Sequence, residues 1–253
     1  MSERVATARR GSYRRLDAAC IIETAERLES RVSERFPGSG LSGVAAELTR
    51  MAREARGRYE RLRRPVLPLR AGVALLVVML VAAELGMAAW LATRSEAASW
   101  SDFIQGLDAS VNALIVSGGA LFFLVTFERR LKRRGMLKAL QEFRALVHVI
   151  EMHQLTKDPE RLLFSGGETT SSPAFHMTPF LLTRYLDYCS EMLAVTSNLA
   201  ALYAQGDDDR VTLEAVDAVE SLAIGISQKI WQKMMIIHAT GLLQEDHPLR
   251  TVS

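Results

Sequence analysis

Two long apolar runs dominate the pattern of the chain. The first covers Ala71–Ala92 and contains one charge, Glu84, whereas the second covers Ala109–Phe127 and contains none. Each is close to the roughly 20 residues that a helix needs to cross the ~30 Å hydrocarbon layer of a membrane. A helix also satisfies its own backbone N–H and C=O groups, which lipid cannot do. The pattern predicts a two-helix transmembrane hairpin over residues 69–127; the alternative is a pair of buried core helices.

Basic side chains flank this hairpin and predict its orientation. They are Arg63, Arg64 and Arg70 before the first run, and Arg129, Arg130, Lys132, Arg133 and Arg134 after the second. The loop between the runs, Thr93–Gly106, contains a single basic residue, Arg94. Because Lys and Arg gather on the cytoplasmic side, we expect a multi-pass protein with both termini cytoplasmic. The eight flanking residues are candidate contacts for the anionic headgroups of the inner leaflet.

The N-terminal segment, residues 1–68, is basic and helical in pattern. Apolar residues recur at spacings of three and four over residues 12–35, with Ser12 as a candidate N-cap. Pro37–Gly40 breaks the pattern, and a second helix is predicted from about Leu41 to Arg64. The segment is predicted to form an amphipathic helical hairpin; the alternative is that both helices lie on the inner leaflet.

The C-terminal segment, residues 128–253, predicts a bundle. The second span is expected to continue as one helix to about Thr156, and Thr178 and Pro179 are expected to begin a further helix. The last helix is predicted from about Val211 to Leu243. Apolar residues alternate at three and four in all three, which is coiled-coil spacing. Short connections make neighbouring helices antiparallel, so we predict an all-α chain whose cytoplasmic part is a three-helix, coiled-coil-like bundle.

Charge is distributed unevenly along the chain, although the total is only +2. Residues 1–70 carry 16 Lys/Arg against 9 Asp/Glu, and residues 128–138 carry 6 against 1. Residues 139–253 carry 8 against 15, a net charge of −7. A basic stretch can bind nucleic acid, but these stretches lie beside the predicted spans. Anionic lipid is therefore the expected partner, and no nucleic acid is expected.

Polar residues inside the predicted spans form a candidate intramembrane site. Glu84 lies in the first run, and Ser117 and Asn112 lie in the second. A carboxylate inside a membrane is costly, and it usually faces protein or water. Glu84 could line a pore or bind a proton; alternatively, a protonated Glu84 forms a hydrogen bond to Ser117 or to a neighbouring copy.

Candidate catalytic chemistry is sparse. His148 and Glu151 can share a helix face, but His153 points elsewhere, so the pattern is not a recognised metal motif. Cys20 and Cys189 are expected to be buried, inert thiols. The Gly-rich loop Ser165–His176 lacks the GK[ST] ending of a phosphate-binding loop and is expected to be a linker. No cofactor is expected.

The stretch His148–Glu160, HVIEMHQLTKDPE, resembles a segment of a family of bacterial inner-membrane proteins. A looser similarity extends over residues 185–233. Members of this family have paired spans and a helical cytoplasmic tail, and no activity is assigned to them. The resemblance implies a bacterial inner membrane and carries no functional residue.

Three functions are compatible with these patterns. The first is non-enzymatic: a membrane-anchored helical scaffold or regulatory subunit, self-associating, whose bundle presents a surface to a partner. The second is a small homo-oligomeric ion channel with Glu84 facing the pore. The third is a metal-dependent enzyme that uses His148 and Glu151. The number of apolar seams and the lack of a catalytic constellation favour the first.

Overall fold

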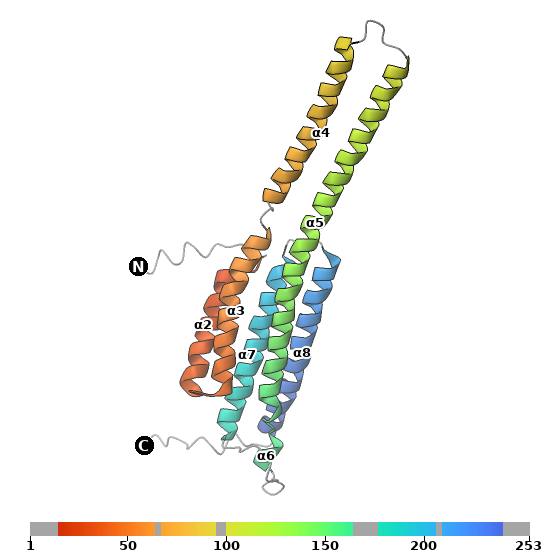
Figure 1. Cartoon of the computed structure of the whole chain (residues 1–253). Helices are drawn as coiled ribbons and strands as arrows, with labels where there is room; N and C mark the ends of the chain where they lie inside the picture. Colours follow the sequence, from red (N-terminus) through yellow and green to blue (C-terminus); the bar gives the residue numbers. More distant parts are fainter. Residues whose placement is uncertain (1–14, 64–66, 95–99, 164–176, 206–208, 240–253) are drawn as a thin grey trace, which may run out of the picture. The chain divides into compact units, whose positions relative to one another are not determined.

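The computed structural model describes residues 15–63, 67–94, 100–163, 177–205 and 209–239 (Figure 1). The helices are α2 (Ala18–Arg35), α3 (Gly40–Arg63), α4 (Leu67–Arg94), α5 (Trp100–Leu155), α6 (Glu160–Leu163), α7 (Pro179–Ala204) and α8 (Arg210–Ala239). No strand occurs among the described residues, and the prediction of an all-α chain is confirmed. The chain divides into two compact units. Unit 1 comprises Met1–Arg61 and Met136–Ser253, and unit 2 comprises Leu62–Gly135.

Helix α2 begins later than the sequence predicted. Ser12 lies outside the described residues, and residues 15–17 are not helical. Asp17 is the N-cap instead: its Oδ1 accepts a hydrogen bond from the backbone N–H of Ala19 at 2.8 Å. A carboxylate at this position satisfies a free amide at the start of the helix. At the other end, Gly38 adopts a φ of 64° in the turn to α3, a conformation that favours glycine.

Helices α2 and α3 pack within unit 1 together with the C-terminal helices. The ring of Phe36, at the end of α2, meets the ring of Tyr185 on α7 edge-on at 5.4 Å. The Tyr59 hydroxyl on α3 donates a hydrogen bond to the carbonyl oxygen of Gln205 at 3.1 Å. Arg31 Nη1 lies 3.2 Å from Glu191 Oε1 on α7. The expected N-terminal hairpin therefore forms and covers part of the bundle.

Aromatic side chains fill the centre of unit 1. Tyr203 and Phe143 are fully buried, and their rings lie 5.8 Å apart. Tyr59 approaches Tyr203 at 6.0 Å, and the Tyr203 hydroxyl lies 3.5 Å from the carbonyl oxygen of Ala55. Helix α7 is central because it is buried on more than one face. The predicted apolar stripe of α7 is buried throughout, at Leu182, Tyr185, Cys189, Met192, Thr196, Leu199 and Tyr203.

The predicted helix ends in the C-terminal part are largely confirmed. Helix α5 is continuous to Leu155, as expected. Asp158 Oδ1 accepts a hydrogen bond from the N–H of Glu160 at the start of α6. Thr178 is the N-cap of α7, with Pro179 in the first turn. The predicted end of the last helix at Leu243 lies outside the described residues, within which α8 ends at Ala239.

One expectation about the cysteines is wrong. Cys189 is fully buried, as predicted, but Cys20 is exposed. Cys20 lies in the first turn of α2, next to the N-cap Asp17, whereas the buried stripe of α2 runs through Ile21, Ala25, Leu28 and Val32. A thiol one position before that stripe points away from it, because successive helical residues are about 100° apart.

Two glycines of α3 provide a matched test of packing. A methyl group on Gly40 would come within 2.5 Å of the His153 imidazole, whereas one on Gly43 would meet nothing within 4 Å. We expect Gly40→Ala to destabilise the protein by about 1 kcal/mol, because the imidazole must move. Gly43→Ala should stabilise it by up to about 1 kcal/mol through helix propensity. Thermal unfolding of the full-length protein in detergent, followed by circular dichroism, checks this; shifts of the same sign would contradict it.

Unit 2 pairs α4 with the first part of α5. The less exposed positions of each helix are spaced by four and three, as in a helical seam. They are Val73, Val77, Leu80 and Glu84 on α4, and Ala113, Ser117, Ala120 and Leu124 on α5. Gly135 lies where a Cβ would come within 2.8 Å of Leu62 Cδ2, so a close approach accounts for a glycine in this otherwise continuous helix.

Large apolar side chains cover the outside of unit 2. On α5 they include Leu114, Ile115, Val116, Leu121, Phe122 and Phe123. Among the described residues, one helix, Ile104–Leu155, is long and apolar enough to cross a membrane. Its most apolar stretch has a mean hydropathy of 1.9 and is only 6% buried.

Candidate functional site

An open groove of about 670 Å³ runs between α7 and α8 in unit 1. The α7 wall consists of Ser190, Leu193, Ala194, Ser197 and Asn198. The α8 wall consists of Ala223, Ile224, Ser227, Gln228, Trp231 and Gln232. None of these lining residues carries a charge.

The two walls differ in the size of their side chains. On α8, Trp231 is 63% exposed and Ile224 is 56% exposed. On α7, most of the wall is small, with serine and alanine side chains at positions 190, 194 and 197. Large aromatic and aliphatic groups projecting beside a shallow, small-residue surface are typical of interaction sites rather than of bare surface.

Each wall belongs to a stripe with coiled-coil spacing on the outer face of its helix. The α8 stripe is exposed throughout, at Asp217, Ser221, Ile224, Gln228, Trp231, Met235 and His238. The α7 stripe consists of Thr183, Asp187, Ser190, Ala194, Ser197 and Ala201. Because steps of three and four keep side chains on one face, each stripe can contact a further helix.

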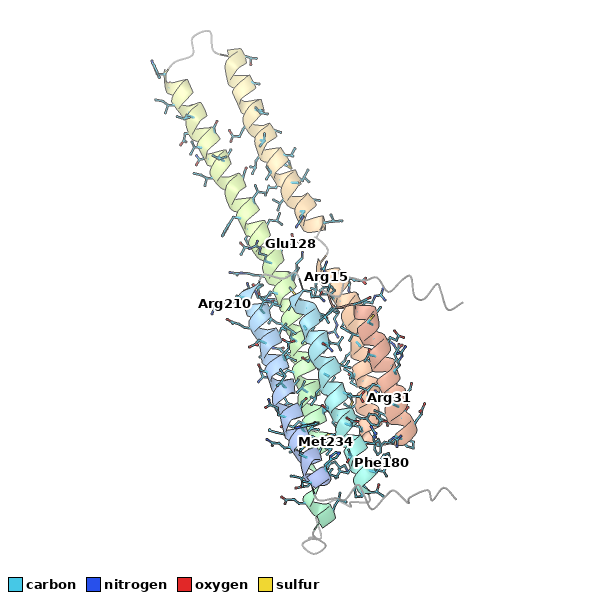
Figure 2. The ribbon with its side chains drawn as sticks, turned by 180° about the vertical axis from the view of Figure 1, so that it is seen from behind. Arg15, Arg31, Glu128, Phe180, Arg210 and Met234 are labelled. Atoms are coloured by element: carbon cyan, nitrogen blue, oxygen red, sulfur yellow. The ribbon has the colours of Figure 1, made fainter. Side chains whose placement is uncertain are left out.

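The groove is left open because the other faces of both helices are already used. Helix α7 buries its aromatic face against α2 and α3, and α8 buries Val216, Val219, Ala223, Ile226, Ile230 and Ile237. Figure 2 shows Phe180 near the same end of unit 1 as Met234, and Arg210 at the opposite end. Helices α7 and α8 are therefore antiparallel, and Ser190 and Trp231 lie toward the same end of the groove.

A polar cluster closes the end of α5 within unit 1. Lys233 Nζ donates hydrogen bonds to the carbonyl oxygens of Gln154 at 2.9 Å and Lys157 at 3.3 Å. The Tyr185 hydroxyl donates to the carbonyl oxygen of His153 at 3.3 Å. A cation here satisfies carbonyls that have no partner at a helix C-terminus. Burial lowers the pKa of the Lys233 ammonium. The cluster holds the helix end in place.

Buried weak acids in this core predict a loss of stability at alkaline pH. Burial raises the pKa of the Cys189 thiol from 9.0 to about 12, and that of Tyr203 from 10.0 to about 12. The folded state disfavours both ionised forms, so the stability present below pH 9 is lost as the pH rises from about 9 to about 12. For Cys189 the loss is on the order of 4 kcal/mol.

Cys189→Ala should therefore flatten the pH dependence of the unfolding temperature between pH 9 and 12, and the exposed-site control Cys20→Ala should not. The measurement is thermal unfolding in detergent across that range. A slope that is equal in wild type and Cys189→Ala would contradict the assignment. Lys233 acts in the opposite direction, because its lowered pKa adds stability as the pH rises toward 10.5.

The candidate intramembrane residues lie in unit 2. Glu84 and Ser117 are half-buried, and both fall on the seams between α4 and α5. No hydrogen bond joins these two side chains in the described part of the chain. Asn112 is exposed, with its amide nitrogen 3.5 Å from Asp108 Oδ2 on the same helix. Glu84 and Ser117 thus lie on the less exposed faces of α4 and α5, whereas Asn112 lies on an exposed face of α5.

An ion cluster that the sequence analysis missed joins α4 to α5. Arg70 Nε lies 3.0 Å from Glu128 Oε2, and Lys132 Nζ lies 2.8 Å from Glu128 Oε1. The Glu128 side chain is only 7% exposed. Arg70 and Lys132, both candidate contacts for lipid headgroups, form ion pairs here with a buried carboxylate. Glu128 is the one acidic residue in the basic stretch 128–138, and this was the sequence feature that could have indicated an ion pair.

The remaining candidate headgroup contacts differ in exposure. Arg129, Arg130 and Arg134 are exposed, and Arg133 is half-buried. The side chain of Arg63 and the whole of Arg64 lie outside the described residues, as does the loop predicted at Ser165–His176. Three exposed guanidinium groups within six residues are suited to bind phosphate groups.

The candidate metal residues belong to a network of polar contacts with Lys229. His148 Nδ1 lies 3.4 Å from Glu151 Oε2, and Lys229 Nζ lies 3.2 Å from Glu151 Oε1. Lys229 is the first cause, and His148 a lesser one, of the lowered pKa of Glu151. Within the described ranges, no three His, Cys, Asp or Glu side chains are grouped in a way that could hold a metal ion. Glu151 thus links α5 to α8.

Comparison with known proteins identified no similar protein. No protein-family model, curated protein or solved structure matches this chain.

Proposed function

We propose that the chain is a scaffold or regulatory subunit of a bacterial inner membrane. The hairpin of residues 71–92 and 109–127 spans the membrane, with both termini in the cytoplasm. Unit 1 holds the α7–α8 groove available to another protein chain. The single observation that carries the proposal is this groove, which is open, is lined without charge and presents the exposed side chains of Ile224 and Trp231.

The exposure of unit 2 supports the membrane part of the proposal. Its large apolar side chains point outward along α4 and α5, where water would be an unfavourable surrounding. The ion cluster of Arg70, Glu128 and Lys132 lies just beyond the apolar runs, where an aqueous or headgroup region is expected.

The position of Glu84 favours packing over the channel alternative. Glu84 is half-buried on the less exposed stripe of α4, which also includes Val73, Val77 and Leu80. A pore-lining carboxylate would instead lie on an open face of the hairpin. The metal-enzyme alternative has less support, because Lys229 occupies the Glu151 carboxylate.

Topology and cross-linking test the proposal together. Reporters fused before Met1 and after Ser253 should report the cytoplasm, and one inserted at residues 95–99 should report the periplasm. A photo-cross-linking residue at Ser197 in the groove should trap one reproducible protein, identified by mass spectrometry, and Trp231→Lys should abolish the adduct. The same group at the exposed Leu213, outside the groove, is the control. Equal adducts at both positions, or a periplasmic C-terminus, would refute the proposal.

A further inference from the structure

We propose that the occupant of the α7–α8 groove is a second copy of this chain. Trp231 of each copy lies against the small-residue wall of α7 in the other copy. The inference rests on the proposed function, because it names the partner of the same groove.

The groove is complementary to itself. A two-fold axis parallel to the helices, in the plane between the two copies, places α8 of one copy over α7 of the other. Such an axis preserves height along the helices, so Trp231 of the second copy reaches the Ser190 end of the groove. Ile224 reaches the end formed by Ser197 and Asn198. One surface thus supplies both the projecting groups and the hollow that receives them, as a two-fold interface requires.

Charge restricts where two copies can meet. Residues 139–253 carry a net charge of −7, whereas the N-terminal residues 1–70, most of which belong to the same unit, carry 16 Lys/Arg against 9 Asp/Glu. Most surfaces of unit 1 therefore bear charges that a second copy would have to desolvate or oppose. The groove is lined without charge. Two copies can therefore bury the groove lining without bringing two identical charged side chains together. A strongly basic partner is less suited, because the lining offers no carboxylate for it to bind.

The outer stripes extend the contact beyond the groove. Met235 on α8, which is 50% exposed, continues the line of Ile224 and Trp231. On α7, Ala201 continues the line of Ala194 and Ser197. Helices with coiled-coil spacing on their outer faces can form a four-helix layer from two α7–α8 pairs. Anchoring in one membrane would raise the effective concentration of each copy for the other.

A charge-swap mixing experiment tests this contact. The full-length protein is prepared in detergent with two different tags, as wild type, as Trp231→Lys and as Ser190→Glu. Co-purification and multi-angle light scattering then measure association. Each single variant should associate at least tenfold more weakly with itself than the wild type does. A mixture of the two variants should recover association, because one contact becomes Lys–Glu and its symmetric counterpart keeps the native Trp–Ser pair.

The controls distinguish the possible outcomes. Met152→Lys changes an apolar residue of α5 that is also exposed but lies outside the groove, and it should associate as wild type does. Circular dichroism establishes that each variant is folded. Wild-type protein that stays monomeric, or single variants that associate normally, would overturn the inference, as would a mixture that fails to recover association.

Failure of this inference is separable from failure of the proposed function. A monomeric chain that still gives one reproducible adduct at Ser197 would keep the scaffold role and assign the groove to a different protein. A monomeric chain without any protein adduct would contradict both. A dimer sensitive to Trp231→Lys, in a chain whose reporters place the C-terminus in the periplasm, would keep the contact and remove the membrane arrangement.

Discussion

Ile115→Arg combined with Phe122→Arg should prevent stable insertion of the chain into a membrane. Both side chains are exposed on the same face of α5, at 64% and 74%. If lipid surrounds this face, each arginine near the middle of a span costs roughly 2.5–3.5 kcal/mol of insertion free energy. The combined cost of the two should be near the sum of the single ones, because each side chain meets lipid separately. Membrane-fraction yield after alkaline washing measures the effect.

The same helix provides the control for this prediction. Val149 and Met152 are also exposed apolar residues of α5, but they lie in unit 1. The double variant Val149→Arg with Met152→Arg should insert as wild type does, because these positions face water in the proposed arrangement. If the double variant Ile115→Arg with Phe122→Arg inserted normally, or became soluble without detergent while remaining folded, this face of α5 could not be in contact with lipid.

Phe143→Ala should cause the largest loss of folding stability in unit 1. The Phe143 ring is fully buried and packs against Tyr203, which in turn contacts Tyr59. Removing a buried phenyl ring costs about 3–5 kcal/mol, because the surrounding helices close the cavity only in part. That is a large fraction of the stability of a typical domain. The groove depends on α7 and α8 being held in place, so association between copies should fall with it.

Phe180→Ala is the matched control for the core variant. Phe180 lies in the first turn of α7 and is exposed, and the guanidinium groups of Arg35 and Arg184 lie over its ring. Exposed contacts of this kind contribute about 0.5–1 kcal/mol. Chemical denaturation in detergent, followed by helical circular dichroism, should therefore separate the two variants by several kcal/mol. Equal losses would mean that Phe143 is not part of the core described here.

The sequence was sufficient for the features that follow from local periodicity. The buried residues of α7 and α8 recur mainly at spacings of three and four, as predicted. Thr178 and Pro179 begin α7 as predicted, since capping depends on neighbouring residues alone. Continuity of α5 through Gly135 was also predicted, but the reason for a glycine at this position, the close approach of Leu62, was not.

The features that were missed depend on which face of a helix is left uncovered. Helix α8 has apolar residues on two faces, and only the buried face was predicted. The spacing of Ile224, Trp231 and Met235 was visible, but their exposure depends on where α7 lies. Cys20 was misjudged for a related reason, because it neighbours the buried stripe without belonging to it. The ion pair of Arg70 with Glu128 joins residues that are far apart in sequence, so a local pattern could not reveal it.

The central claim is that lipid surrounds the hairpin, and a spin label at Leu114 tests it most directly. The label is attached to Leu114→Cys in a Cys20→Ser background, with the full-length chain in lipid nanodiscs. Collisions with lipid-soluble oxygen should broaden its signal strongly, whereas an aqueous nickel chelate should have little effect. A label at Met152→Cys should show the reverse. Strong broadening by the nickel chelate at Leu114 would contradict the account.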